Sequence, residues 1–155
     1  MNIKSETLVD YMNTLVGTRQ GSKAHKRIID KYNTLEPLPR GYRVTYTDNW
    51  CATFVTVMMM YIGKASKIAE CSAQKMLDKC KKNKFVLTTK QKPKPKDIVF
   101  YDWDKNGVSN HVGIVSDYDS KSGLISVIEG NKNHAIGVRI IKADSEKILA
   151  IARVK

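Results

Sequence analysis

The chain has 155 residues, 42% of them hydrophobic, and a formal net charge of +12 at pH 7. This length and composition are typical of one globular domain with a sizeable core, so we expect a single domain over residues 1–155. No run approaches the roughly 20 apolar residues that span a bilayer, which excludes a predicted transmembrane helix. The first six residues also lack an apolar signal core, so we expect synthesis in the cytoplasm without Sec export.

Lysines are concentrated between Lys75 and Lys96, where Asp78 is the one acidic residue. Such a stretch is either a solvated face or an attraction for a polyanion, such as nucleic acid, anionic lipid or bacterial wall polymer. Few aromatic residues interleave with these lysines, which disfavours nucleic-acid binding through base stacking. We therefore expect no specific nucleic-acid partner, and keep an anionic wall polymer and a merely solvated face as alternatives.

The first half of the chain predicts helices. A helix is expected over residues 5–17, with Ser5 as its cap and Gly17 as its stop. A second is expected over residues 22–33, with His25 in a basic stretch on the surface.

The stretch from Cys51 to Gly63 is apolar on almost every side, which indicates a buried central helix. Its β-branched residues also suit a strand, and its length decides for the helix. A shorter helix is predicted over residues 72–82, and residues 92–96 form a polar extended linker.

After that linker the pattern changes to short β-rich runs separated by turn residues. The predicted strands are Ile98–Tyr101, His111–Tyr118, Leu124–Ile128, Gly137–Ile141 and Ile148–Val154. Turn residues at 104–107 and 119–123 join the first three strands. Helices followed by strands predict an α+β fold with an antiparallel sheet of about five to six strands.

Three reactive residues stand where apolar elements begin or end. Cys51 opens the buried helix, His111 opens a strand, and Glu129 follows the next strand. A thiol is mostly protonated at neutral pH, and both a helix N-terminus and a nearby imidazolium favour the thiolate. Cysteine, histidine and a carboxylate are therefore the parts of a thiol hydrolase.

Strand alternation places His111 and Gly113 on one face, which leaves room beside the imidazole. We expect Glu129, with Asn131 second or assisting, to accept a hydrogen bond from His111 Nδ1–H and so direct Nε2 at the sulfur. The backbone N–H of Cys51 is the expected oxyanion donor, because first-turn amides lack helical partners.

Asp48 or Asn49 is expected to cap the helix that Cys51 opens. Each catalytic candidate also has a structural interpretation: a buried cysteine in the core, a histidine at a strand end, an acid in a turn. The joint arrangement favours catalysis, with His134 as the weaker alternative base. A zinc site built from the same residue types matches no known spacing, so we expect no metal and no cofactor.

Two further cysteines, Cys71 and Cys80, lie nine residues apart. Without an export signal a disulfide framework is not expected, and no C-x-x-C spacing supports zinc. We interpret both as buried small apolar side chains, with a bridge or a metal site as the alternative.

Four stretches, in this order, resemble the CHAP family of cysteine, histidine-dependent amidohydrolases and peptidases. They are Trp50–Val55, Pro95–Trp103, His111–Val115 and Ile128–Asn131. The similarity covers residues 48–131 well, and the segment before it resembles the lead-in of phage lysins of this family. The resemblance implies a papain-like α+β fold, with the nucleophile at the start of a central helix packed on the sheet.

The resemblance also implies cleavage of bacterial peptidoglycan, at the N-acetylmuramoyl-L-alanine amide or at a peptide bond of the stem or cross-bridge. It assigns Cys51 as nucleophile, His111 as base and Glu129 as the residue that orients the base, with Asn131 nearby. Some members bind calcium through acids around the cysteine. Here Ala52 and Thr53 follow Cys51, so we expect no calcium site. Lys96 stands where the family commonly has glycine.

We therefore expect one catalytic domain, with a helical lead-in at residues 1–47 and a catalytic core at residues 48–155. We expect a monomer that acts on the bacterial cell wall, during phage lysis of a host or after delivery by a secretion machine. The alternatives are an acyltransferase with the same triad and a basic polyanion-binding module in which Cys51 is structural. The sequence does not choose between amidase and endopeptidase.

Overall fold

The computed structural model describes residues 1–155, with helices first and strands second as predicted. The helical elements are the short 3-10 helices η1 (Ser5–Thr7) and η2 (Pro39–Gly41) and the α-helices α1 (Leu8–Leu15), α2 (Lys23–Tyr32), α3 (Cys51–Tyr61) and α4 (Ala73–Lys82). The strands are β1 (Ile98–Tyr101), β2 (His111–Asp119), β3 (Leu124–Lys132), β4 (Ala135–Lys142) and β5 (Ile148–Ala152). No helix has the length and apolar character needed to cross a membrane.

The five strands form one sheet in the order β4-β3-β2-β1-β5, and every neighbouring pair is antiparallel. Strands β2, β3 and β4 are consecutive in the chain, and each pairs with the next. Strand β5 instead lies at the opposite edge of the sheet, beside β1. Together with the four α-helices this is the predicted α+β architecture, and it is consistent with the papain-like arrangement.

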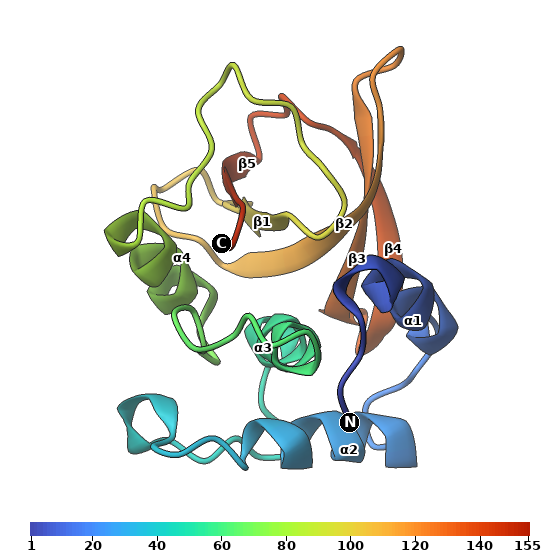
Figure 1. The fold of residues 1–155 in the computed structure, drawn as a ribbon, viewed down its shortest axis with the longest axis vertical. Helices are drawn as coiled ribbons and strands as arrows, with labels where there is room; N and C mark the ends of the chain where they lie inside the picture. The colour runs from blue at the N-terminus through green and yellow to red at the C-terminus, as the bar shows by residue number, and fades with distance from the viewer.

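Helix α3 lies at the centre of the molecule, between α2 on one side and the sheet on the other (Figure 1). All of its residues except Met60 are buried, which explains why its sequence is apolar in every direction. The segment is therefore a helix and not a strand. Other elements of the fold surround it, so its side chains are buried in every direction.

Apolar residues on the two faces of the sheet pack into two different hydrophobic cores. Along β1, Ile98 and Phe100 join the larger core around α3, whereas Val99 and Tyr101 join a smaller core on the far face. This alternation is the period of two that a strand imposes. The smaller core matters for function, because the side chains of His111 and Glu129 share its face.

The end of β3 approaches the first turn of α3 through Gly130. A Cβ atom built on this glycine would lie 2.6 Å from Cβ of Phe54 and 3.1 Å from Cε3 of Trp50. No other residue fits between strand and helix without displacing one of them. The close approach holds the neighbouring strand residues near Cys51, at the helix N-terminus.

The first predicted helix differs from the structure at its start. Residues 5–7 form a 3-10 turn, and the hydroxyl of Ser5 makes no capping hydrogen bond there. The second helix is capped by Ser22, whose Oγ accepts the N–H of His25 at 3.2 Å. The helix predicted over residues 72–82 is present as α4, which begins at Ala73 after Ser72 as its cap.

The prediction that His25 lies on the surface is wrong, because the residue is fully buried. Its Nδ1 accepts the backbone N–H of Gly21 at 3.1 Å, and its ring packs edge-on against Trp50 at 4.6 Å between ring centres. Surrounding lysines and arginines suggested exposure. However, His25 shares the inward stripe with Ile28 and Tyr32, at the spacing of one helix face.

All three cysteines are free thiols. Cys80 lies in the core, and burial raises its pKa to about 12, as expected of an inert apolar side chain. Cys71 differs from the interpretation, because it is partly exposed and lies 3.5 Å from Nη2 of Arg40.

The contact at Gly130 predicts a stability difference between two glycine substitutions on the sheet. Gly130→Ala should lower the free energy of unfolding by about 1–3 kcal/mol, because the added methyl group meets the backbone-anchored part of Phe54. Gly137→Ala is the matched control, since its methyl group meets only the flexible side chain of Lys132. Urea denaturation of both variants measures the difference, and equal midpoints would contradict the packing argument.

Candidate active site

Cys51 is the first residue of α3 and is 4% exposed. Its backbone N–H donates to Oδ1 of Asn49 at 3.1 Å. Of the two predicted caps, Asn49 is therefore the one that serves the helix start. Asp48 instead accepts the N–H of Thr45 at 2.8 Å and the hydroxyl of Tyr42 at 2.7 Å, which holds the loop before the helix.

Four adjacent strands place one cluster of side chains on the smaller-core face. The cluster consists of Tyr101 from β1, His111 from β2, Glu129 from β3 and Arg139 from β4. Tyr101 pairs directly with His111 across the strands, and their rings stack at 5.7 Å between centres. The pairing register agrees with the predicted strand alternation. Alternate residues of each strand point to one face of the sheet, and in this register those of neighbouring strands lie side by side.

Glu129 reaches His111 by passing over Gly113. A Cβ atom on Gly113 would lie 2.7 Å from Cγ of Glu129, so the glycine leaves the space that the acidic side chain fills. The predicted hydrogen bond between the two residues is present: Oε1 of Glu129 lies 3.0 Å from a ring nitrogen of His111.

The nitrogen that faces Glu129 is Nε2, which is the reverse of our expectation. Glu129 approaches from the neighbouring strand and meets the outer end of the imidazole. Nδ1, nearer the backbone of β2, is the remaining ring nitrogen, and the Cys51 thiol is among the groups that raise the pKa of the imidazole. The sequence predicts the partners of His111 but not which ring nitrogen each takes.

The environment of His111 favours its charged form. Burial by itself lowers the pKa of the imidazole, but the interactions with the Cys51 thiol and the Glu129 carboxylate outweigh burial and raise the pKa to about 9. His111 therefore carries a proton at neutral pH. The stability contributed by this charge is complete below the ordinary pKa near 6.5 and is lost as the pH rises through about 9.

Arg139 is a site residue that our sequence reasoning missed. Its Nε donates to both carboxylate oxygens of Glu129, at 3.1 and 2.9 Å, and the Glu129 side chain is fully buried. Burial raises the pKa of Glu129, but the hydrogen bonds from His111 and Arg139 outweigh it and hold the pKa below its ordinary value. The available signal was an arginine on β4 whose parity places it beside Glu129.

Aromatic rings support this arginine from the other side. Cζ of Arg139 lies 4.6 Å from the ring centre of Trp103 and 5.6 Å from that of Tyr101. The two rings stack on one another at 4.6 Å. A guanidinium over an indole is a favourable cation–π arrangement, so the plane of Arg139 is fixed by contacts on its edge and on its face.

Asn131 makes no hydrogen bond to His111, which differs from its expected role as a second orienting residue. It lies at a register shift of β3 with a φ of 58°, a left-handed conformation that asparagine tolerates. The bend directs its side chain toward the start of α3, where Nδ2 donates to Oδ1 of Asn49 at 3.1 Å.

Asn49 Oδ1 therefore receives two donors, the Cys51 N–H and the Asn131 amide. The expectation that the Cys51 N–H is unpaired is wrong in this state, because the preceding loop supplies an acceptor. His134, the weaker candidate base, lies in the turn between β3 and β4, where it contacts Gln20 at 3.4 Å. No three His, Cys, Asp or Glu side chains converge as ligands for a metal ion.

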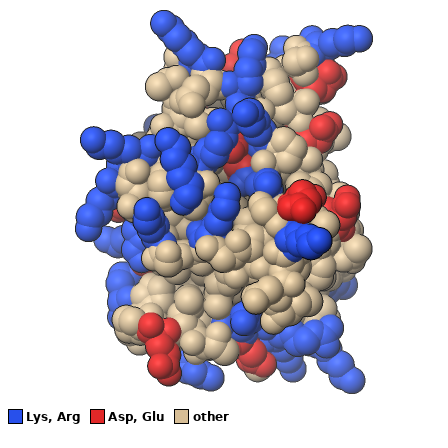
Figure 2. All heavy atoms as spheres, viewed as in Figure 1, with Lys and Arg blue, Asp and Glu red and all other residues tan.

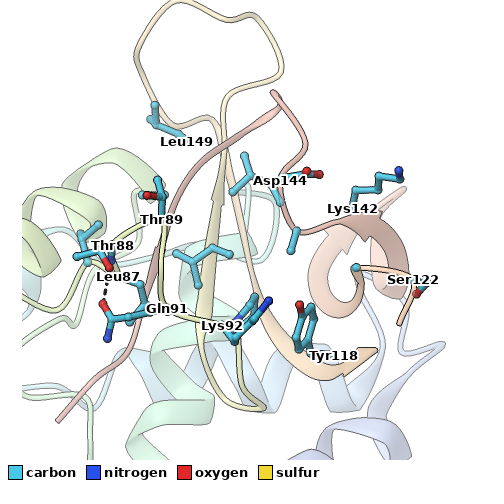
Figure 3. A pocket seen from close by; sticks show the side chains of 17 residues that line it. Leu87, Thr88, Thr89, Gln91, Lys92, Tyr118, Ser122, Lys142, Asp144 and Leu149 are labelled. Atoms are coloured by element: carbon cyan, nitrogen blue, oxygen red, sulfur yellow. Dashed lines mark hydrogen bonds between the residues drawn. The ribbon is translucent and has the colours of Figure 1, made fainter. Parts of the chain in front are cut away.

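A cleft of about 380 Å³ opens beside His111, and its lining includes Trp103, Lys132 and Arg139. A larger cavity of about 450 Å³ lies elsewhere, between the segment after α4 and the ends of β4 and β5 (Figure 3). Its lining includes Tyr118 and Lys92 but none of the four predicted site residues. Of the four predicted site residues, His111 and Asn131 line the smaller cleft, whereas Cys51 and Glu129 do not.

The charge on Glu129 predicts the titration of His111. In an NMR titration, His111 should deprotonate near pH 9, and Glu129→Gln should move this transition toward the ordinary value because it removes the negative partner. The resonance of His134 should not respond to the substitution. Deprotonation of wild-type His111 near pH 6.5 would contradict the buried ion pair.

Comparison with known proteins identifies one family. A search among curated proteins found no match. A family model, the CHAP domain, matches residues 41–131, which include Cys51, His111, Glu129 and Asn131. The match covers more than half of the 155 residues and contains α3, strands β1 and β2, and β3 except its last residue. The chain therefore belongs to the CHAP domain family.

Proposed function

We propose that this protein hydrolyses an amide bond of bacterial peptidoglycan, with Cys51 as nucleophile, His111 as acid and base, and Glu129 as the residue that orients and charges the imidazole. Membership of the CHAP family indicates a peptidoglycan hydrolase or amidase type of activity. The observation that supports the catalytic roles is the position of His111, with Glu129 3.0 Å from Nε2 and the thiol of Cys51 interacting with the same ring.

In the first step the Cys51 thiolate attacks the carbonyl carbon of the scissile amide, and a carbon–sulfur bond forms. The carbon–nitrogen bond then breaks, and protonated His111 gives its proton to the leaving amine. The product is a thioester on Cys51 and a free amine. Glu129, held by Arg139, stays ionised and keeps the imidazole in the orientation that the transfer needs.

In the second step neutral His111 takes a proton from water, whose oxygen attacks the thioester carbonyl. The carbon–sulfur bond breaks, the carboxylic acid leaves, and the thiolate and imidazolium pair is restored. In both steps we assign the Cys51 N–H as an oxyanion donor, with the Asn131 amide as its partner. Both now donate to Asn49 Oδ1, an exposed side chain that the substrate oxygen can displace.

The charge distribution supports retention on the cell wall. Lys and Arg side chains gather over α4 and the segment that follows it, with few acids among them (Figure 2). Teichoic-type and other wall polymers are anionic, so this surface raises the local concentration of the enzyme at its substrate. We propose that the protein acts there as a monomer, after it reaches the wall by host lysis or by a secretion machine.

Replacement of the nucleophile should abolish activity without loss of the fold. Cys51→Ala and Cys51→Ser should each reduce the lysis of purified walls, followed as turbidity, by at least about 10³-fold, because the residual thiol-free site cannot form the thioester. Cys71→Ser is the matched control, since Cys71 is a partly exposed thiol that lies beside Arg40. Full lysis by either Cys51 variant would refute the assignment of Cys51 as the nucleophile.

The products separate hydrolysis from acyl transfer. Digestion of purified peptidoglycan in ¹⁸O-labelled water should give one labelled carboxyl group for every new amino terminus, and mass spectrometry of the fragments identifies the bond. A fragment whose mass includes an acceptor amine or thiol in place of water would show an acyltransferase that uses the same triad. The identity of the new amino terminus distinguishes an amidase from an endopeptidase.

A further inference from the structure

The cleft beside His111 carries positive charge that the catalytic steps do not use. Two cationic side chains, Arg139 and Lys132, line it together with His111. No acidic side chain lines the cleft, because Glu129 is fully buried beneath it. Asp104 lies outside the lining, where it accepts a hydrogen bond from Asn110 at 3.1 Å. The cleft therefore has the charge of a site for an anion.

Arg139 presents half of its guanidinium to this cleft. Its two hydrogen bonds to Glu129 both run from Nε, so Nη1 and Nη2 do not take part in holding the acid, and the Tyr101 hydroxyl is the other protein group that interacts with the guanidinium. The side chain is 30% exposed, and the Trp103 ring beneath it fixes the plane of the fork. Two parallel N–H groups in a fixed plane match the two oxygens of a carboxylate.

Lys132 supplies a second cation at the same wall. Its aliphatic stem lies over Gly137, where a Cβ atom would come within 2.9 Å of its Cδ. None of the ion pairs of the structure includes Lys132. The ammonium group is therefore positioned at the cleft without a protein counter-charge.

We propose that this cleft is a subsite for a free carboxylate of the peptidoglycan peptide, bound by Nη1 and Nη2 of Arg139 and by Nζ of Lys132. The inference rests on the proposed function. His111 delivers its proton to the leaving amine, so the cleft that His111 lines accommodates the amine side of the scissile bond. The enzyme accordingly prefers wall peptides whose amine-side fragment carries a free carboxylate over peptides in which that group is a carboxamide.

A matched pair of substrates tests the preference whichever amide bond the enzyme cleaves. One preparation of sacculi with free peptide carboxylates is divided, and half is converted to carboxamides with carbodiimide and ammonia. The rate of release of new amino termini, measured at low substrate concentration, should be about tenfold higher on the carboxylate form, because a charge-assisted bidentate contact is lost on the other. Equal rates on the two forms would overturn the subsite.

Lys132→Gln locates the preference in the cleft. This variant should lose most of the preference for the carboxylate form, measured within the variant as the ratio of its rates on the two forms. Lys142→Gln is the matched control, because Lys142 lies on the same strand pair, at the other cavity, and its replacement removes the same charge. Equal losses in both variants would show attraction by overall charge and would contradict the subsite.

The outcomes also separate this inference from the proposed function. Hydrolysis of both forms at equal rates leaves the peptidoglycan hydrolase intact and removes the carboxylate subsite alone. Hydrolysis of neither form, in a preparation that a known lysin digests, would refute the hydrolase and the subsite together.

Discussion

The carboxylate of Glu129 is fully buried, and an isolated carboxylate in such a position would give up its charge rather than remain ionised. His111 and Arg139 flank it, with contacts of 3.0 and 2.9 Å. Loss of one partner from a buried pair of this kind costs about 3–5 kcal/mol, because the remaining charge is left uncompensated. The ionised acid keeps His111 protonated in turn, so that a fixed positive charge faces Cys51 at the start of α3.

Much of this arrangement could be predicted from the sequence, because it depends on short-range periodicity. The apolar run after Cys51 predicts a buried helix, and strand alternation predicts the shared face of His111 and Glu129. Two glycines then make the approach possible: Gly113 leaves the path for the acid, and Gly130 lets the strand meet the helix. The sequence alone does not show that these glycines make room for neighbouring side chains, because that depends on how the strands pair. Taken by itself, a glycine within a strand only weakens the strand.

Other features depend on partners that no local pattern identifies. The choice of Nε2 by Glu129 follows from the direction in which the acid crosses the sheet, and this is set by the pairing register. Asn131 turns away from His111 because a register shift with a positive φ redirects its side chain. Lys96, which stands where the family commonly has glycine, has a φ of 79°, so the family's glycine preference there has a backbone cause.

Arg139 contacts the buried Glu129 carboxylate and also lines the cleft. A lysine could not take its place, because a single ammonium group cannot hold Glu129 and present a planar pair of N–H donors at once. Its orientation is fixed before a substrate arrives, so binding a carboxylate loses little side-chain entropy. A carboxylate at Nη1 and Nη2 also adds negative charge near His111, which raises the pKa of the imidazole further. Occupation of the cleft then favours the protonated form of His111, which is the form that must give its proton to the leaving amine.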